Sequence, residues 1–199
     1  VIAPKNRKED LRSAVRSAVK QSVPVEVLVI DDGSTDGTSA MIRAEYPQVR
    51  LVRDDQSRGY IRQRNRGAEL ASTPYIFSID DDATFSSPNV VEQTLHDFDD
   101  PRIGVVAIPF INVNQDQIIR QRAPEESGVF VLDSYIGTAH ALRREVFLAL
   151  GGYKGGLIHQ GEESEFCIRM LEAGYHVRAG RSDPIHHFES PRRIGDRMN

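Results

Sequence analysis

The sequence has only one cysteine, Cys167, among its 199 residues. An internal disulfide and a zinc site built on several cysteines are therefore excluded. No apolar run approaches the ~18 residues of a membrane-spanning helix, and no signal peptide is present. The formal net charge of −4 gives no excess of basic residues, so we expect no nucleic-acid partner.

Two common nucleotide-binding patterns are also missing. The sequence contains neither the Gly-x-Gly-x-x-Gly fingerprint of dinucleotide-binding folds nor the Gly-x4-Gly-Lys phosphate loop. Their absence argues against dinucleotide and P-loop chemistry.

What remains is the composition of one ordinary globular domain, with 39% hydrophobic and 27% charged residues. We therefore expect a single domain over residues 1–199. The lone cysteine fits a reducing compartment, so the expected location is the cytoplasm. The chain opens at Val1 inside an apolar segment without an initiator Met, which leads us to expect a catalytic segment of a longer protein. A peripheral position at the inner face of the membrane would need segments absent here.

Apolar runs and amphipathic segments alternate in the first half of the chain. The pattern predicts strands at 1–3, 25–30, 49–52, 75–79 and 104–109, and helices at 10–20, 36–46, 60–71 and from 87 onward. This rhythm is typical of crossover units, so we predict an α/β fold with a mainly parallel, Rossmann-like central sheet flanked by helices.

The second half has a different character. Residues 112–127 are polar and predict a loop or an edge excursion, followed by a strand at 138–142 and a helix at 144–150. Lys154 to Gly161 contains three glycines and no periodicity, which predicts a mobile lid. A helix is expected from Glu162 to Ala173, with Gly174 as its C-terminal cap.

Two predicted strands end in acidic residues. Asp80, Asp81 and Asp82 follow the apolar run 75–79, and Asp31 and Asp32 follow the run 27–30. Mg²⁺ and Mn²⁺ take oxygen ligands and are often held by carboxylates together with substrate phosphates. The pair of acidic strand ends therefore indicates a metal-dependent site for a phosphorylated ligand, although each one alone could be a polar turn that closes a strand.

The segment Asp31 to Asp36 also resembles the Asp-x-Asp-Gly-Thr motif of phosphatases that form an aspartyl phosphate. The register does not fit, because Ile30 stands two residues before Asp32, where the nucleophilic aspartate is needed. We therefore exclude that chemistry.

Taken in order, several short motifs resemble the family-two glycosyltransferases of GT-A fold. They lie at 3–7, 29–36, 64–67, 79–82, 143–153 and 161–166, and so extend over nearly the whole chain. Each motif alone is weak, whereas the ordered set is specific. The resemblance implies a single GT-A domain with a nucleotide-binding half at about 1–110 and an acceptor-binding half at about 111–199.

The resemblance also implies roles for individual residues. Asp80 and Asp82 would form the Asp-x-Asp motif of the family, with Asp82 the direct ligand of Mn²⁺ or Mg²⁺ on the diphosphate. His187 would be a further metal ligand, although a lone histidine is often structural, and His186 is a weaker candidate. Asp31 or Asp32 would accept a hydrogen bond from the base. The other residues expected to border the nucleotide are Pro4, Asn6, Arg7, Arg64 and Asp81; Arg192 and Arg193 could contact phosphates but fit a solvated surface better.

The acidic pair Glu162-Glu163 matches a Glu-Asp pair of the family, in which the second residue is the usual catalytic base. Glycosyl transfer needs a base for the proton of the acceptor hydroxyl, and a helix N-terminus favours an ionised carboxylate. We therefore expect Glu163 to be the base, in ionised form. The alternative is that these acids only complement the helix dipole, which we accept for Glu165 because Arg169 is its local partner.

The predicted function is metal-dependent transfer of a sugar from a UDP-, GDP- or dTDP-sugar to a sugar or glycoconjugate acceptor, with inversion by family analogy. A sugar-nucleotide pyrophosphorylase is one alternative, but it would carry a glycine-rich N-terminal loop, and residues 4–7 contain no glycine. A non-catalytic nucleotide- or sugar-binding module is another. Such a module would be marked by loss of the metal or base carboxylates, and both are present.

Overall fold

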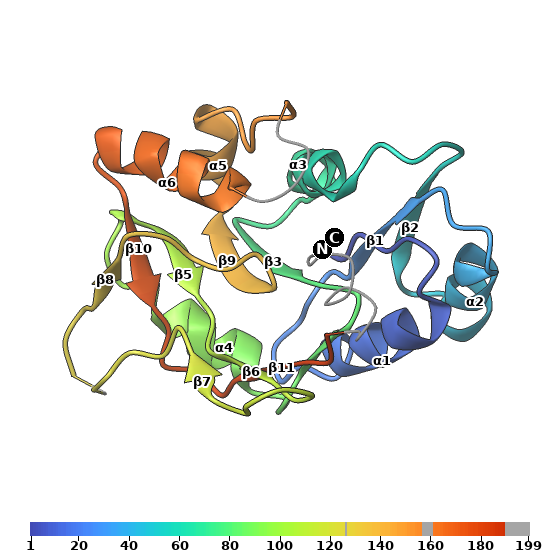
Figure 1. Ribbon diagram of the computed structural model, residues 1–199, viewed down its shortest axis with the longest axis horizontal. Helices are drawn as coiled ribbons and strands as arrows, with labels where there is room; N and C mark the ends of the chain where they lie inside the picture. Colours follow the sequence, from blue (N-terminus) through green and yellow to red (C-terminus); the bar gives the residue numbers. More distant parts are fainter. Residues whose placement is uncertain (126, 157–160, 190–199) are drawn as a thin grey trace.

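The computed structural model describes residues 1–125, 127–156 and 161–189. Strands and helices alternate through the first half, as the hydrophobic pattern predicts (Figure 1). The elements are α1 (Lys8–Ala18), β1 (Leu28–Asp32), α2 (Thr38–Glu45), β2 (Arg50–Asp54), α3 (Tyr60–Leu70), β3 (Tyr75–Ile79), β4 (Ala83–Phe85), α4 (Val90–His96) and β5 (Ile103–Ala107). Strand β1 begins later than predicted and includes Asp31 and Asp32, so these two acids lie within a fully buried strand.

The second half adds short strands and two helices. They are β6 (Phe110–Asn112), β7 (Ile119–Arg120), β8 (Val131–Leu132), β9 (Ala139–Arg143), α5 (Arg144–Ala149), α6 (Glu162–Glu172), β10 (His176–Ala179) and β11 (Ile185–His187). The described residues of the polar segment 112–127 include β7 at the edge of a sheet, in agreement with the expected loop or edge excursion. Residues 157–160 of the predicted lid, as well as Arg192 and Arg193, lie outside the described residues.

The central sheet has the strand order β3-β9-β5-β10-β8. The N-terminal segment connects it to the β1–β2 pair, because Ile2 bridges Val29 in parallel and the amino group of Val1 donates to the Phe77 carbonyl. The expected α/β fold is confirmed. The sheet is mixed where we predicted mainly parallel pairing, because β9 runs antiparallel to both β3 and β5. Strand β9 follows the long excursion of the second half, so no crossover helix imposes a parallel direction on it.

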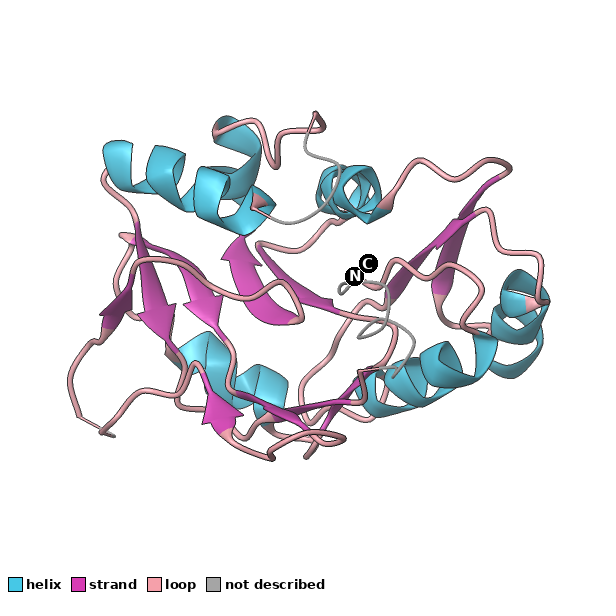
Figure 2. Cartoon of the chain, in the orientation of Figure 1, coloured by secondary structure: helices cyan, strands magenta, loops and turns pink. Residues whose placement is uncertain are grey.

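Helices cover both faces of this sheet (Figure 2). One hydrophobic cluster joins Leu11 of α1 and Val90 of α4 to one face of the sheet, and a second joins Phe147 of α5 and Phe166 of α6 to the other. The alternation within strands follows this division, since Val106 of β5 belongs to the first cluster and its neighbours Val105 and Ala107 belong to the second. The two faces are therefore both buried, and the polar residues of a site must lie at the strand ends.

A second sheet, with the order β4-β11-β6-β7, lies beside the acidic triplet. Strand β11 pairs antiparallel with β4 and parallel with β6, and this register sets His187 opposite both Ala83 and Asn112. Strand β4 begins directly after Asp82, so the backbone ladder itself brings His187 next to the triplet. Our sequence analysis did not predict β11.

None of the helices described in residues 1–125, 127–156 and 161–189 is long and apolar enough to span a bilayer.

Candidate active site

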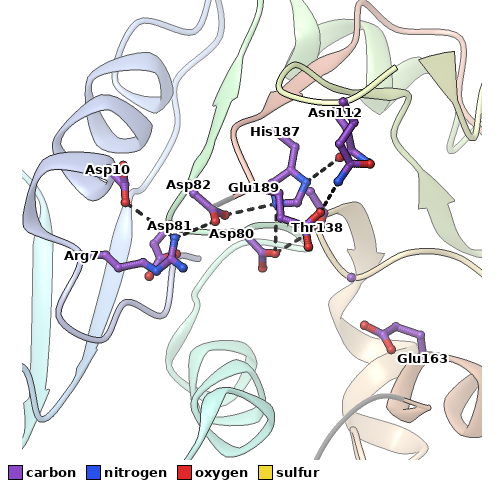
Figure 3. A network of polar contacts seen from close by, with 12 residues as sticks. Arg7, Asp10, Asp80, Asp81, Asp82, Asn112, Thr138, Glu163, His187 and Glu189 are labelled. Atoms are coloured by element: carbon purple, nitrogen blue, oxygen red, sulfur yellow. Dashed lines mark hydrogen bonds and ion pairs between the residues drawn. The ribbon is translucent and has the colours of Figure 1, made fainter. Parts of the chain in front are cut away.

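Asp80, Asp82 and His187 form a group that can hold a divalent cation. Their ligand atoms all lie within 4.8 Å of one another (Figure 3). His187 Nε2 is 3.3 Å from Asp82 Oδ1 and 4.0 Å from Asp80 Oδ2. It is also buried and makes no hydrogen bond with any residue that the structure describes. The two carboxylates supply the oxygen ligands that Mn²⁺ and Mg²⁺ prefer, and an imidazole nitrogen is tolerated beside them by Mn²⁺. The three predicted residues thus come together from separate parts of the chain.

Arg7 lies against the same acids from the N-terminal loop. Its Nη1 donates to Asp82 Oδ2 at 2.7 Å, and its Nε is 3.8 Å from Asp81 Oδ1. The two oxygens of Asp82 are therefore divided, with Oδ2 toward Arg7 and Oδ1 toward His187. Arg7, which we expected beside the nucleotide, is part of the acidic group in this structure (Figure 3).

Arg64 of α3 connects this acidic group to α6. Its Nη2 donates to Asp80 Oδ1 at 2.8 Å and to the Gly137 carbonyl at 3.0 Å. Its Nη1 is 3.4 Å from both Glu162 Oε1 and Glu163 Oε1. Burial alone would lower the pKa of Arg64, but the surrounding carboxylates raise it above its ordinary value, so the guanidinium stays charged.

Glu163 is the accessible member of the acidic pair. Its side chain is 14% exposed, whereas that of Glu162 is 1% exposed. Burial raises the pKa of Glu163 to about 7, against the charge of Arg64 and with help from Glu162. The helix N-terminus led us to expect a fully ionised carboxylate, but desolvation outweighs the helix dipole here. A carboxyl that titrates near neutral pH is well matched to a general base.

Gly137 is a site residue that our sequence analysis missed. A Cβ atom at this position would overlap Glu163 Oε1 and lie 2.7 Å from Arg64 Nη1. The neighbouring Thr138 donates from Oγ1 to Asp80 Oδ2 at 3.2 Å. The loop before β9 therefore leaves room for the Glu163–Arg64 contact and supports Asp80. No local sequence signal marks this glycine, because the crowding comes from α3 and α6.

Asp31 and Asp32 are 0% and 3% exposed, and both hold neighbouring loops in place. Asp31 accepts from the Ser34 amide and from Arg53, both at 2.8 Å, and also from Ser39. The donors to Asp32 are Ser57 Oγ at 2.5 Å, the amides of Arg58 and Gly59 at 2.7 and 3.1 Å, and Gln63 Nε2 at 2.5 Å. Burial would raise the pKa of Asp32, but these donors lower it below its ordinary value.

The loop that contains Pro4 and Asn6 packs beside β1. The Pro4 carbonyl accepts from the Asp32 amide at 3.0 Å, and Asn6 Oδ1 accepts from the Thr35 amide at 2.7 Å. The structure thus joins the predicted nucleotide residues of the two loops, and their contacts with a nucleotide stay a prediction.

A family model described as Glycosyl transferase family 2 matches residues 1–157. The chain belongs to this family. This membership favours sugar transfer over the pyrophosphorylase and the non-catalytic module. The match ends before Glu163 and His187, so the roles of these two residues rest on the geometry described above.

Individual relatives of this glycosyltransferase agree with the family match. A glucosyl-dolichyl phosphate glucuronosyltransferase from Haloferax volcanii is 26% identical over an alignment 189 residues long, gaps included, which covers 83% of this chain and 60% of the relative. A mannosyltransferase from Pyrobaculum calidifontis, solved with GDP-Man and Mn²⁺, superposes with a TM-score of 0.80 at 21% identity, covering 96% of this chain and 56% of that one. GalNAc-T7, solved with UDP, GalNAc and Mn²⁺, gives 0.79 at 22% identity, covering 94% and 43%.

These structural likenesses establish the GT-A fold. The chain spans 26% and 60% of the first two curated relatives that it matches, so the substrates of a whole protein do not follow from them.

Proposed function

We propose that this glycosyltransferase domain moves a sugar from a nucleotide sugar to an acceptor hydroxyl, with a divalent cation and with inversion at the anomeric carbon. The observation that carries the proposal is the Arg64 contact set. One guanidinium holds Asp80 of the metal group on one side and Glu163 of the candidate base pair on the other. A leaving diphosphate and an attacking hydroxyl must be served at neighbouring positions, and this arrangement provides groups for both.

The geometry of the site supports a cation. The ligand atoms of Asp80, Asp82 and His187 lie within 4.8 Å of one another, so one divalent cation could contact all three. A bound Mn²⁺ or Mg²⁺ would be held by Asp80, Asp82 and His187 and would supply charge neutralisation on the leaving diphosphate.

The protein's own groups account for the remaining chemistry. Glu163, partly exposed and titrating near neutral pH, accepts the proton of the acceptor hydroxyl. Arg64 keeps this carboxylate in place, and Gly137 leaves the space in which the two side chains meet. Direct displacement on the face opposite the diphosphate then inverts the anomeric centre.

The donor is a UDP-, GDP- or dTDP-sugar bound by the half at about 1–110, and the acceptor is a sugar or glycoconjugate bound by the half at about 111–199. The neighbours solved with GDP-Man or UDP and Mn²⁺ support this choice of donor class. Within the first half, the loops around Pro4, Asn6, Asp31 and Asp32 border the nucleotide, and Asp81 lies beside its phosphates.

A thermal-shift screen of UDP-, GDP- and dTDP-sugars, with Mn²⁺ or with chelator, tests this function. A ligand that binds the native state stabilises it by mass action, by about 2.7 kcal/mol at one hundred times its Kd. We expect one nucleotide to raise Tm only with Mn²⁺, and the shift to disappear in Asp82→Ala. The control Glu172→Gln changes an exposed acid at the far end of α6 and should respond like wild type. An equal shift in chelator or in Asp82→Ala would reject the metal-dependent site.

A further inference from the structure

His187 presents its two ring nitrogens to different partners. Nε2 faces Asp82 Oδ1 at 3.3 Å, while Nδ1 is 2.8 Å from Asn112 Oδ1 on the neighbouring strand β6 (Figure 3). A neutral imidazole carries one proton, and a metal can bind only the nitrogen without it. Which nitrogen is protonated therefore decides whether His187 can ligate an ion between Asp80 and Asp82.

The partner of Nδ1 belongs to a chain of hydrogen bonds with one direction. Asn112 Nδ2 donates to Gln115 Oε1 at 3.3 Å, and Gln115 Nε2 donates to Glu189 Oε2 at 2.6 Å. Glu189 is 6% exposed and lies two residues after His187. This series of hydrogen bonds thus runs from β11 to β6 and the turn that follows it, and then returns to the residues just after β11.

The direction follows from the donor and acceptor capacity of each group. A carboxylate only accepts, so Gln115 must turn its NH₂ group toward Glu189 and its oxygen toward Asn112. Asn112 must then donate its NH₂ group to Gln115, which leaves its oxygen toward His187. An amide oxygen only accepts, so the proton of a neutral imidazole must be on Nδ1.

We propose that Asn112, Gln115 and Glu189 are positioning residues that hold His187 as the Nδ1–H tautomer, with the Nε2 lone pair directed at the metal site. We call these three residues the relay. The carboxylate of Asp82 by itself favours a proton on Nε2 of His187, and the relay favours the proton on Nδ1 instead. This inference rests on the proposed metal-dependent function. Outer partners that orient a ligating histidine are typically worth 10–100-fold in metal affinity.

The tautomer can be read in metal-free protein by long-range ¹H–¹⁵N spectra of ¹⁵N-histidine-labelled samples at alkaline pH, with the His187 signals assigned by their loss in His187→Gln. We expect Nδ1–H in the wild type. Asn112→Ala and Glu189→Gln should shift the population toward Nε2–H, because the first removes the acceptor and the second lets the amides turn around. Asn112→Asp keeps an acceptor and should retain Nδ1–H.

A titration with Mn²⁺ alone, followed by electron paramagnetic resonance, gives the second readout. Asn112→Ala and Glu189→Gln should weaken Mn²⁺ binding by roughly 10–100-fold. Gln115→Leu, at an exposed position where the fold should tolerate it, should do the same. The matched control is Asn114→Ala, an exposed amide in the same turn, which should bind Mn²⁺ like wild type.

The outcomes separate this inference from the proposed function. The inference about the relay would be wrong if His187 carries its proton on Nε2 in the wild type. It would also be wrong if the relay variants keep the wild-type tautomer and Mn²⁺ affinity. In either case the metal site itself would stand. If the wild type binds no Mn²⁺ but the His187 tautomer changes in Asn112→Ala and Glu189→Gln, the relay is supported and the metal-dependent function is rejected.

Discussion

Replacing Glu163 with glutamine tests the base directly, because the substitution keeps the size of the side chain and removes its ability to accept a proton. A general base contributes roughly 10²–10⁴-fold to turnover, and we expect Glu163→Gln to lower kcat by about that factor. Donor affinity should change little, since the base acts on the acceptor. The assay is the rate of sugar transfer or, with water as acceptor, hydrolysis of the nucleotide sugar that gives the largest thermal shift.

The pH profile of the wild type gives the same assignment a second test. Burial raises the pKa of Glu163 from 4.5 to about 7, and only the ionised form is a base. Roughly a tenth of the protein is active one pH unit below that pKa and about nine tenths one unit above it, so kcat should rise from about pH 6 to about pH 8. The free energy of unfolding changes in the opposite direction to kcat. Between pH 4.5 and about 7, the folded state keeps the proton on Glu163, whereas the unfolded state has lost it. Ionisation of Glu163 therefore lowers stability as pH rises through that window.

Two neighbouring acids provide controls. Glu162→Gln removes a like charge beside Glu163, so the rise in kcat should move to lower pH. Glu165→Gln should leave the profile unchanged, because this carboxylate is bound by Arg169 at 2.6 Å. Normal turnover in Glu163→Gln together with loss in Glu162→Gln would move the base one residue earlier. Normal turnover in both would refute our account of α6.

The remaining predictions concern Gly137 and Asp32. Gly137→Ala should lower kcat about 10²-fold, because the added methyl displaces Glu163 and Arg64. A kcat equal to that of the wild type would exclude the steric argument. Asp32→Asn should lower the free energy of unfolding by about 1–3 kcal/mol, since a buried acceptor of several hydrogen bonds is impaired, and should weaken nucleotide binding. Denaturant unfolding and calorimetry check these effects, and unchanged stability would show that the loop contacts of Asp32 contribute little.

The elements marked by local signals were predicted closely from the sequence. Strand β3 has the predicted bounds, because an apolar run between Pro74 and three aspartates has little other place to begin or end. The start of α6 behind Gly161 is also as predicted. The acids of the metal group could be named for the same reason, since each stands at the edge of a hydrophobic run.

Contacts between distant segments could not be predicted in this way. Strand β11 has three residues, and its place depends on pairing with β4 and β6, which lie far earlier in the chain. The family resemblance places Arg64 near the nucleotide, which stays a prediction, but nothing in its own helix shows that Asp80 and Glu163 converge on it. The helix position of Glu163 suggested full ionisation, whereas its pKa is set by burial that only tertiary packing creates.

The insertion of β11 between β4 and β6 imposes an order on the assembly of the centre. Residues 83–85 and 110–112 leave the ribosome well before residues 185–187, so neither β4 nor β6 can pair with β11 until β11 has been synthesised. Closing loops of this length is slow compared with forming a helix or hairpin. The ligand group of Asp80, Asp82 and His187 is therefore completed only when β11 has paired with β4 and β6, and a nascent chain that lacks β11 has the two aspartates without the histidine.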